Sequence, residues 1–172
     1  MGKLFKMTPA PSTSHQQVLW RITKSIGQVS SLEKCDVFIA PFDVRPFPND
    51  PQTVVQPDIS ILCDASKLDE KGCNGAPDLI IEILSPSTAS KDLNEKYDIY
   101  EKAGVKEYWT VDAADGIINV YLLMDGIYVP QRPYTYRQEI ESAVIPGLVL
   151  DLKEIFSSYL EEPEVPYEGK RI

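Results

Sequence analysis

The 172-residue sequence has little histidine, little cysteine and no long hydrophobic run. Its single histidine excludes a histidine-rich metal centre, which leaves carboxylates as the available metal ligands. The three cysteines, Cys35, Cys63 and Cys73, are widely spaced and include no C-x-x-C pair, so neither a zinc site nor a disulfide framework is predicted. We expect all three thiols to be reduced.

No segment of the sequence has the features of a membrane span or a secretory signal. The longest apolar run, Leu79–Leu84, is interrupted by Glu82 and is far shorter than the roughly 20 residues that a membrane helix needs. The first seven residues carry two lysines but no apolar core with a cleavage site. We therefore expect a cytoplasmic protein without contact to a membrane.

Acidic residues outnumber basic residues by 26 to 17, which gives a formal net charge of −9. This charge opposes binding to a phosphate backbone, because lysine and arginine supply most of the affinity in such complexes. A carboxylate metal site would concentrate negative charge that bound cations offset. The length and the 43% hydrophobic content fit one globular domain over residues 1–172.

The pattern of apolar and turn-forming residues predicts alternating helices and strands. An extended lead-in over 1–14 should precede a helix over about 15–30, where apolar residues recur at helical spacing. A second helix over 91–103 is bounded by Ser90 as N-cap and Gly104 as the residue after its end. A short helix within 149–160 should precede an irregular tail over 161–172.

The predicted strands fall into two groups. The early strands flank a turn-rich segment that contains Pro46, Pro48 and Pro51. The last three strands should form an antiparallel meander, because Asp115-Gly116 and Asp125-Gly126 are typical hairpin dipeptides. A surface loop is expected over 64–75. The strands are predicted over 35–44, 54–62, 79–84, 107–111, 117–123 and 127–129.

Two acidic residues lie in strands that should be apolar. Glu82 interrupts the strand that we expect to be most buried, where an unpartnered carboxylate costs several kcal/mol. Asp58 lies in a second apolar strand, and if the two strands pair, opposed side chains are about 5 Å apart at Cβ. Two such carboxylates can hold one Mg²⁺ or Mn²⁺ ion. An ordinary ion pair for Glu82 and a structural role for Asp58 at a strand start remain open.

The helix after this strand carries polar residues at four-residue spacing. Asp92, Lys96 and Tyr100 therefore share one helical face. An Asp92–Lys96 pair alone would be an ordinary surface salt bridge. The helix must fold back on the strand of Glu82, which favours placing Lys96 near the carboxylates. Four aromatic residues are assigned to packing: Tyr97, Tyr100, Tyr108 and Trp109.

Several segments stand out: Pro9-Ala10-Pro11-Ser12 with His15-Gln16, Val55-Gln56-Pro57-Asp58, the run from Gly75 to Thr88, Asp92, Lys96-Tyr97, the run from Gly104 to Trp109, and Pro146-Gly147-Leu148. Together they resemble the Uma-type restriction endonuclease family of the PD-(D/E)xK nuclease superfamily. The resemblance implies a restriction-endonuclease-like α/β (α+β) fold with a mixed central sheet flanked by helices, in which Asp58 and Glu82 bind a magnesium-type ion. Leu84 stands where the simplest pattern of the superfamily has lysine, and Lys96 is the implied substitute. The resemblance covers almost the whole chain.

Three further residues are secondary candidates for the site. Asp92 would orient Lys96. Asp78 shares strand parity with Glu82 and could face the site, although a Pro-Asp pair at a strand start is as often structural. His15 resembles a family position, although an exposed place at the start of the first helix is the simpler expectation.

The predicted function is metal-dependent hydrolysis of DNA phosphodiester bonds, with Asp58, Glu82 and Lys96 as catalytic residues. A homodimer is expected, because cleavage of a duplex requires two strands to be cut. Two alternatives stay open: a non-catalytic binding or assembly module that keeps the fold, and a hydrolase of another phosphoester. The acidic charge favours the module, whereas the intact ligand positions and the candidate lysine favour an enzyme.

Overall fold

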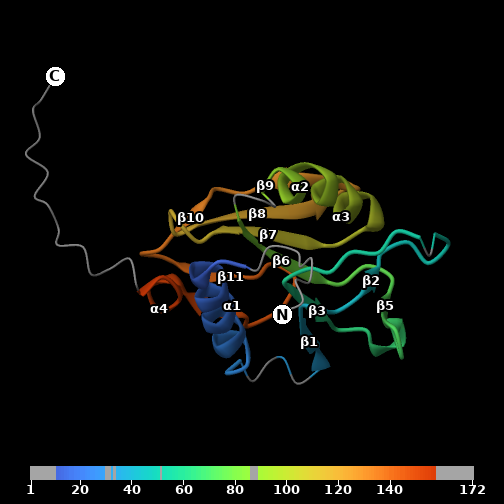
Figure 1. Cartoon of the computed structure of the whole chain (residues 1–172), viewed down its shortest axis with the longest axis horizontal. Coiled ribbons are helices and arrows are strands. Elements are labelled where there is room, and N and C mark those ends of the chain that lie inside the picture. The colour runs from blue at the N-terminus through green and yellow to red at the C-terminus, as the bar shows by residue number, and fades with distance from the viewer. Residues whose placement is uncertain (1–10, 30–31, 33, 51, 86–88, 158–172) are drawn as a thin grey trace, which may run out of the picture.

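A mixed β-sheet forms the centre of the molecule in the computed structural model, which describes residues 11–29, 32, 34–50, 52–85 and 89–157 (Figure 1). The order of the strands is β1-β3-β6-β7-β8-β10, and β9 also pairs with β8. Strands β6 and β7 are parallel, and the other neighbouring pairs are antiparallel. This arrangement confirms the predicted fold class. The strands are β1 (Asp36–Ile39), β3 (Ile59–Leu62), β6 (Leu79–Leu84), β7 (Glu107–Asp112), β8 (Ile117–Met124), β9 (Ile127–Pro130) and β10 (Tyr134–Thr135).

Helices cover both faces of this sheet. The connection between the parallel strands β6 and β7 contains α2 (Ala89–Lys91), a π-helical turn (Asp92–Lys96) and α3 (Tyr97–Ala103). In Figure 1 these helices lie on one side of the strands, and α1 (Thr13–Ile26) and α4 (Leu152–Ile155) lie on the other. The alternation of side chains along each strand therefore divides the core between an α1 face and an α3 face.

The parity of β6 decides where its carboxylate points. Leu79, Ile81 and Ile83 pack with the buried residues of α1. Ile80 packs with Tyr100 of α3 on the opposite face. Glu82 shares the parity of Ile80, so its side chain lies beneath α3. In β3, residues 59 and 61 likewise belong to the α1 face.

The first helix begins earlier than predicted. Ser12 is its N-cap and accepts a hydrogen bond from the backbone N–H of His15, so α1 starts at Thr13, within the predicted lead-in. It ends at Ile26, before the predicted end at residue 30. Residues 1–10 of the lead-in and residues 161–172 of the predicted tail lie outside the described residues.

The first two predicted strands are too long. β1 ends at Ile39, so the chain leaves the sheet before residue 44. The Ala40-Pro41 peptide bond that follows is cis. The second strand contributes only β3 to the sheet, because residue 57 is a proline and cannot donate a ladder hydrogen bond. Val55 instead forms an isolated bridge with Val44.

The predicted surface loop over 64–75 contains regular structure. A parallel pair, β2 with β5, and an antiparallel pair, β4 with β5, build a small three-stranded sheet. Arg45 donates to Asp69 at 2.6 Å across this sheet. Strands of two or three residues are too short to show alternation in a sequence. The elements are β2 (Val44–Arg45), a 3₁₀ turn (Ala65–Lys67), β4 (Leu68–Asp69) and β5 (Gly72–Asn74).

The later elements follow the predictions closely. Gly104 ends α3 with φ 88°, in the left-handed region that glycine tolerates. The other end differs, because the helical segment begins at Ala89 and Ser90 therefore lies inside it. The meander β7-β8-β9 is confirmed with its turns, in which Asp125 and Gly126 have φ of 52° and 82°. Two further strands, β11 (Glu139–Glu141) and β12 (Val149–Asp151), pair before α4.

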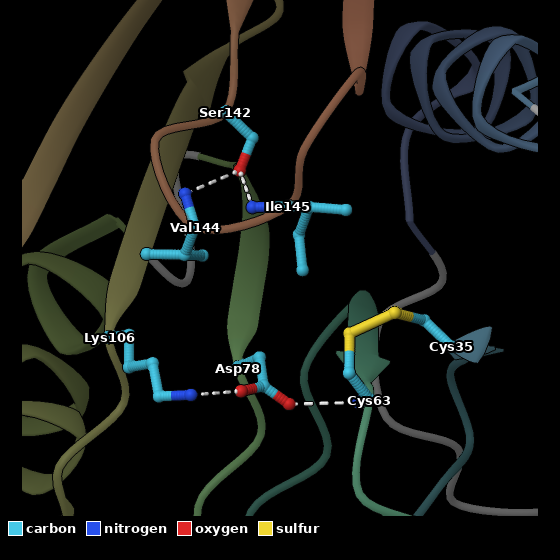
Figure 2. The surroundings of a disulfide bond; sticks show 7 residues. All are labelled: Cys35, Cys63, Asp78, Lys106, Ser142, Val144 and Ile145. Atoms are coloured by element: carbon cyan, nitrogen blue, oxygen red, sulfur yellow. Dashed lines mark hydrogen bonds and ion pairs between the residues drawn. A yellow bond between two sulfur atoms is a disulfide. The ribbon is translucent and has the colours of Figure 1, made fainter. Parts of the chain in front are cut away.

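A fully buried carboxylate anchors the segment after β11. Glu107, at the start of β7, accepts hydrogen bonds from Trp109 Nε1 at 2.7 Å and from Ser142 Oγ at 2.6 Å. The backbone N–H of Val144 donates to the same carboxylate at 3.2 Å. The Ser142 hydroxyl also accepts from the backbone N–H groups of Val144 and Ile145 (Figure 2). Three donors thus replace water around a carboxylate that is 0% exposed.

Cys35 and Cys63 form a disulfide, with sulfur atoms 2.06 Å apart, so the prediction of three reduced thiols is wrong (Figure 2). The register of β1 and β3 pairs Asp36 with Leu62, and one step further along it brings Cys35 opposite Cys63. Cys73 is a buried free thiol. None of the helices in the described residues has the length and hydrophobicity of a membrane span.

Candidate active site

The two predicted metal ligands lie side by side on neighbouring strands. The antiparallel register of β3 and β6 pairs Ile59 with Ile81, so the next step places Asp58 opposite Glu82. Opposed residues of antiparallel strands have Cβ atoms about 5 Å apart. The backbone N–H of Ile83 donates to Asp58 Oδ2 at 2.8 Å, and the N–H of Ala40 donates to the Asp58 carbonyl at 3.0 Å. The first bond holds Asp58 against β6, and the second holds it against the end of β1.

Glu82 is buried beneath α3 and receives two donors on one oxygen. Its side chain is 3% exposed. Lys96 Nζ and the Tyr100 hydroxyl each lie 2.7 Å from Glu82 Oε1. Burial, together with the nearby carboxylates of Asp58 and Asp92, raises the pKa of Glu82 to about 7 against the opposing effect of Lys96. The ammonium group is therefore the main group that favours the ionised form.

Lys96 bridges two buried carboxylates. Its Nζ lies 2.7 Å from Glu82 Oε1 and 2.8 Å from Asp92 Oδ1, and the Asp92 side chain is 2% exposed. Burial alone would lower the pKa of Lys96, but Glu82 and Asp92 together raise it above its ordinary value. Lys96 is therefore an ammonium ion near neutral pH, and Asp92 has the position that we predicted for a residue orienting it.

The lysine and its partner belong to a π-helical turn. The turn Asp92–Lys96 interrupts the helical segment, and the Tyr108 hydroxyl donates to the Asp92 carbonyl at 3.0 Å. Single π-helical turns inside helices are frequent at functional sites. The four-residue spacing therefore grouped the correct side chains, although the local helix is wider than the regular α-helix on which that prediction relied.

His15 is buried beside Asp58, and the expectation of an exposed side chain is wrong. The residue is 7% exposed, and its Nε2 lies 3.2 Å from Asp58 Oδ2. The hydrogen bond with Asp58 raises the pKa of His15, against the opposing effect of burial. His15 lies in the first turn of α1, which packs on the opposite face of the sheet. A residue from that face therefore contacts Asp58, directly before β3.

Asp78 is not part of this cluster. It precedes β6, four residues before Glu82, and a strand rises about 3.3 Å per residue, so the two lie toward opposite ends of the strand. Asp78 accepts from Lys106 Nζ at 2.6 Å and from the backbone N–H of Cys63 at 2.8 Å (Figure 2). Asp78 does share the strand parity of Glu82, as predicted, but parity does not specify how far apart two residues lie along the strand.

Tyr100 is the site residue that the sequence interpretation missed. Its ring does pack, with an edge contact to Tyr108 at 5.1 Å between centroids, as the assignment to the core predicted. Its hydroxyl, however, donates to the predicted ligand Glu82. Burial and Glu82 raise the pKa of Tyr100 well above its ordinary value, so the hydroxyl stays a donor. The signal was present in the spacing, because Tyr100 follows Lys96 by four residues.

The chemistry of the carboxylates fits a hard divalent ion. Among the described residues, no hydrogen bond is donated to Asp58 Oδ1 or to Glu82 Oε2, so each carboxylate has one oxygen available. No three His, Cys, Asp or Glu side chains in the described part of the chain gather as a complete ligand set. Magnesium is commonly held by one or two carboxylates and keeps several water ligands, which suits this pair.

Comparison with known proteins gives one family and one fold. The model of the Uma2 family, described as putative restriction endonuclease, matches residues 1–153. The chain has no significant match among curated proteins. The crystal structure of a putative nuclease of DUF820 from Anabaena variabilis is similar, with a TM-score of 0.65 and 22% identity over 87% of this chain and 83% of that chain. That likeness shows a common fold. Because the family match extends over most of the sequence, the protein belongs to the Uma2 family of putative restriction endonucleases.

Proposed function

We propose that the protein is a cytoplasmic, metal-dependent endonuclease that hydrolyses phosphodiester bonds of DNA. Membership of the Uma2 family supports a nuclease in general. The observation that carries the proposal is the grouping of two opposed carboxylates, Asp58 and Glu82, with the partly buried ammonium of Lys96 at 2.7 Å from Glu82. This combination provides ligands for a hard cation and a fixed positive charge in one place.

Asp58 and Glu82 are the residues that would hold Mg²⁺ or Mn²⁺, each through its available oxygen. Such an ion supplies Lewis-acid polarisation of the phosphate and lowers the pKa of a bound water. Lys96 would orient the attacking water or stabilise negative charge that develops on the phosphate. Asp92, 2.8 Å from Nζ, keeps Lys96 charged and directed toward Glu82. His15 Nε2 contacts Asp58 Oδ2, so Oδ1 is the oxygen of Asp58 that would bind the ion.

The charged residues of the site affect how it could bind a nucleic acid. Glu82 and Asp92 both contact Lys96, and Asp58 lies opposite Glu82, so three carboxylates share one lysine and the site would repel phosphate without a bound cation. Binding of a divalent ion offsets this charge and reconciles a nucleic-acid substrate with the net charge of −9. We expect a homodimer to act on duplex DNA, with one site for each strand.

The direct test is cleavage of supercoiled and single-stranded DNA by the purified chain with Mg²⁺ or Mn²⁺. Glu82→Gln and Lys96→Met should each lower the rate by about 100-fold or more, as loss of one electrostatic group does in other active sites. Lys106→Met is the control for removal of a lysine, because Lys106 forms an ion pair with Asp78 away from the site. Its rate should stay near that of the unchanged chain, and a chelator should abolish cleavage.

Two outcomes would favour the alternatives. A folded chain that neither cleaves DNA nor binds Mn²⁺ in calorimetry would refute the nuclease and support a non-catalytic binding module, which the acidic charge favours. Cleavage of a small phosphodiester that DNA does not inhibit would instead support a hydrolase of another phosphoester.

A further inference from the structure

Two donors of different chemistry meet on a single oxygen of Glu82. Lys96 Nζ and the Tyr100 hydroxyl both lie 2.7 Å from Oε1. Oε2 receives no hydrogen bond from the described residues. A carboxylate held twice through one oxygen cannot turn about its terminal bond without breaking both contacts. The pair of donors therefore fixes which oxygen of Glu82 is presented to an ion.

Tyr100 itself has little freedom to move. The residue is 0% exposed, and its ring makes an edge contact with the fully buried Tyr108 at 5.1 Å and an interplanar angle of 70°. Tyr108 is in turn hydrogen-bonded to the Asp92 carbonyl in the π-helical turn. The hydroxyl is thus carried by a packed ring, and a packed ring loses less conformational entropy in holding one direction than a long flexible side chain does.

The two donors divide their tasks. Lys96 is shared between Glu82 and Asp92, and in the proposed function it also faces the substrate, so its ammonium can change partners during a reaction. Tyr100 is a neutral donor that adds no charge to repel a cation. It can hold Oε1 when the ammonium turns toward the phosphate.

We propose that Tyr100 is a positioning residue of the metal site. Its hydroxyl holds Oε1 of Glu82, so that Oε2 is presented to a divalent ion that Glu82 would share with Asp58. This inference rests on the proposed function, because it assumes that Asp58 and Glu82 bind the ion. Partners that orient metal ligands in other proteins change metal affinity by about 10- to 100-fold when they are removed.

The test is calorimetric titration of the full chain with Mn²⁺, comparing Tyr100→Phe with the unchanged protein. The substitution keeps the ring and its packing and removes only the hydroxyl. Tyr97→Phe is the matched control, because Tyr97 lies on the same helix and its hydroxyl is 3.5 Å from the Tyr128 carbonyl, away from Glu82. Mn²⁺ affinity should fall by about 10- to 100-fold for Tyr100→Phe and by less than about twofold for Tyr97→Phe.

A second measurement separates positioning from loss of structure. If Tyr100→Phe only weakens ion binding, its rate of DNA cleavage should return to that of the unchanged protein at saturating Mn²⁺. A damaged fold would instead keep the rate low even at saturating Mn²⁺. Unchanged Mn²⁺ affinity in Tyr100→Phe, or an equal loss in Tyr97→Phe, would overturn the inference and leave the proposed function intact. Absence of Mn²⁺ binding by the unchanged protein would refute the metal site itself.

Discussion

Reduction of the Cys35–Cys63 disulfide should lower the free energy of unfolding by about 3.5 kcal/mol. The two cysteines are 28 residues apart, and the loop-entropy model gives about 3 kcal/mol for a 15-residue loop and about 4.7 kcal/mol for 100 residues. The four residue pairs between β1 and β3 should survive reduction, so the effect acts mainly on the unfolded chain. For a chain of this size, 1 kcal/mol shifts Tm by about 2–4 °C, which predicts a decrease of about 7–14 °C.

The assay is thermal unfolding followed by circular dichroism, with and without a phosphine reductant. The unchanged protein should lose stability when the reductant is added. Cys63→Ser should unfold at the lower temperature under both conditions and serves as the control for effects of the reductant itself. Alkylation in denaturant provides an independent count, with one labelled thiol, Cys73, before reduction and three after it.

Two results would refute this reasoning. Three labelled thiols before reduction would mean that the cysteines are reduced in the native protein, as the sequence alone suggested. A disulfide that forms but leaves Tm unchanged on reduction would mean that the unfolded chain is already restricted, or that the native pair is strained by an equal amount.

Three further predictions concern buried ionisable groups. Because the pKa of Glu82 is raised to about 7 and the ionised form binds metal, Mn²⁺ affinity should weaken as pH falls from about 8 to about 6; a flat profile would contradict this. The pKa of His15 is raised by Asp58, so the stability difference between the unchanged protein and His15→Gln should be fully present below about pH 6.5, the unfolded value, and should vanish as pH rises through the folded pKa. Glu107→Leu removes the acceptor of two buried donors, Trp109 Nε1 and Ser142 Oγ, and should lower the free energy of unfolding by about 3 kcal/mol or more in urea titration, whereas Glu107→Gln, which retains one oxygen, should lose less.

The strand that carries Glu82 was predictable because every signal for it is local. A run of apolar residues with one interruption is bounded by Asp78 and by Ser85, and β6 occupies the predicted range Leu79–Leu84. The meander after α3 was predictable for the same reason, because glycine-containing turns mark each reversal of the chain. Strand pairing and parity then predicted that Asp58 and Glu82 share a face.

The contacts that could not be predicted all depend on the packing of separate elements. Cys35 and Cys63 meet because β1 and β3 are in one particular register, and a shift of one residue would place them on opposite faces. Their separation of 28 residues contains no such information. The short strands of the three-stranded sheet are likewise stabilised by neighbours, since β5 pairs with two partners that come from different parts of the chain.

The site combines both kinds of information. The spacing therefore identified Lys96 but not the role of Tyr100, and His15 was a candidate only through the family resemblance. Lys96 and Tyr100 lie on one helical face, so their spacing predicts that they point the same way, but the sequence does not distinguish a tyrosine that only packs from one whose hydroxyl also reaches Glu82. His15 belongs to a helix that packs on the opposite face of the sheet, and it contacts Asp58 directly before β3 begins. Periodicity identifies the face of each residue, and only the arrangement of helices around the sheet decides which faces converge.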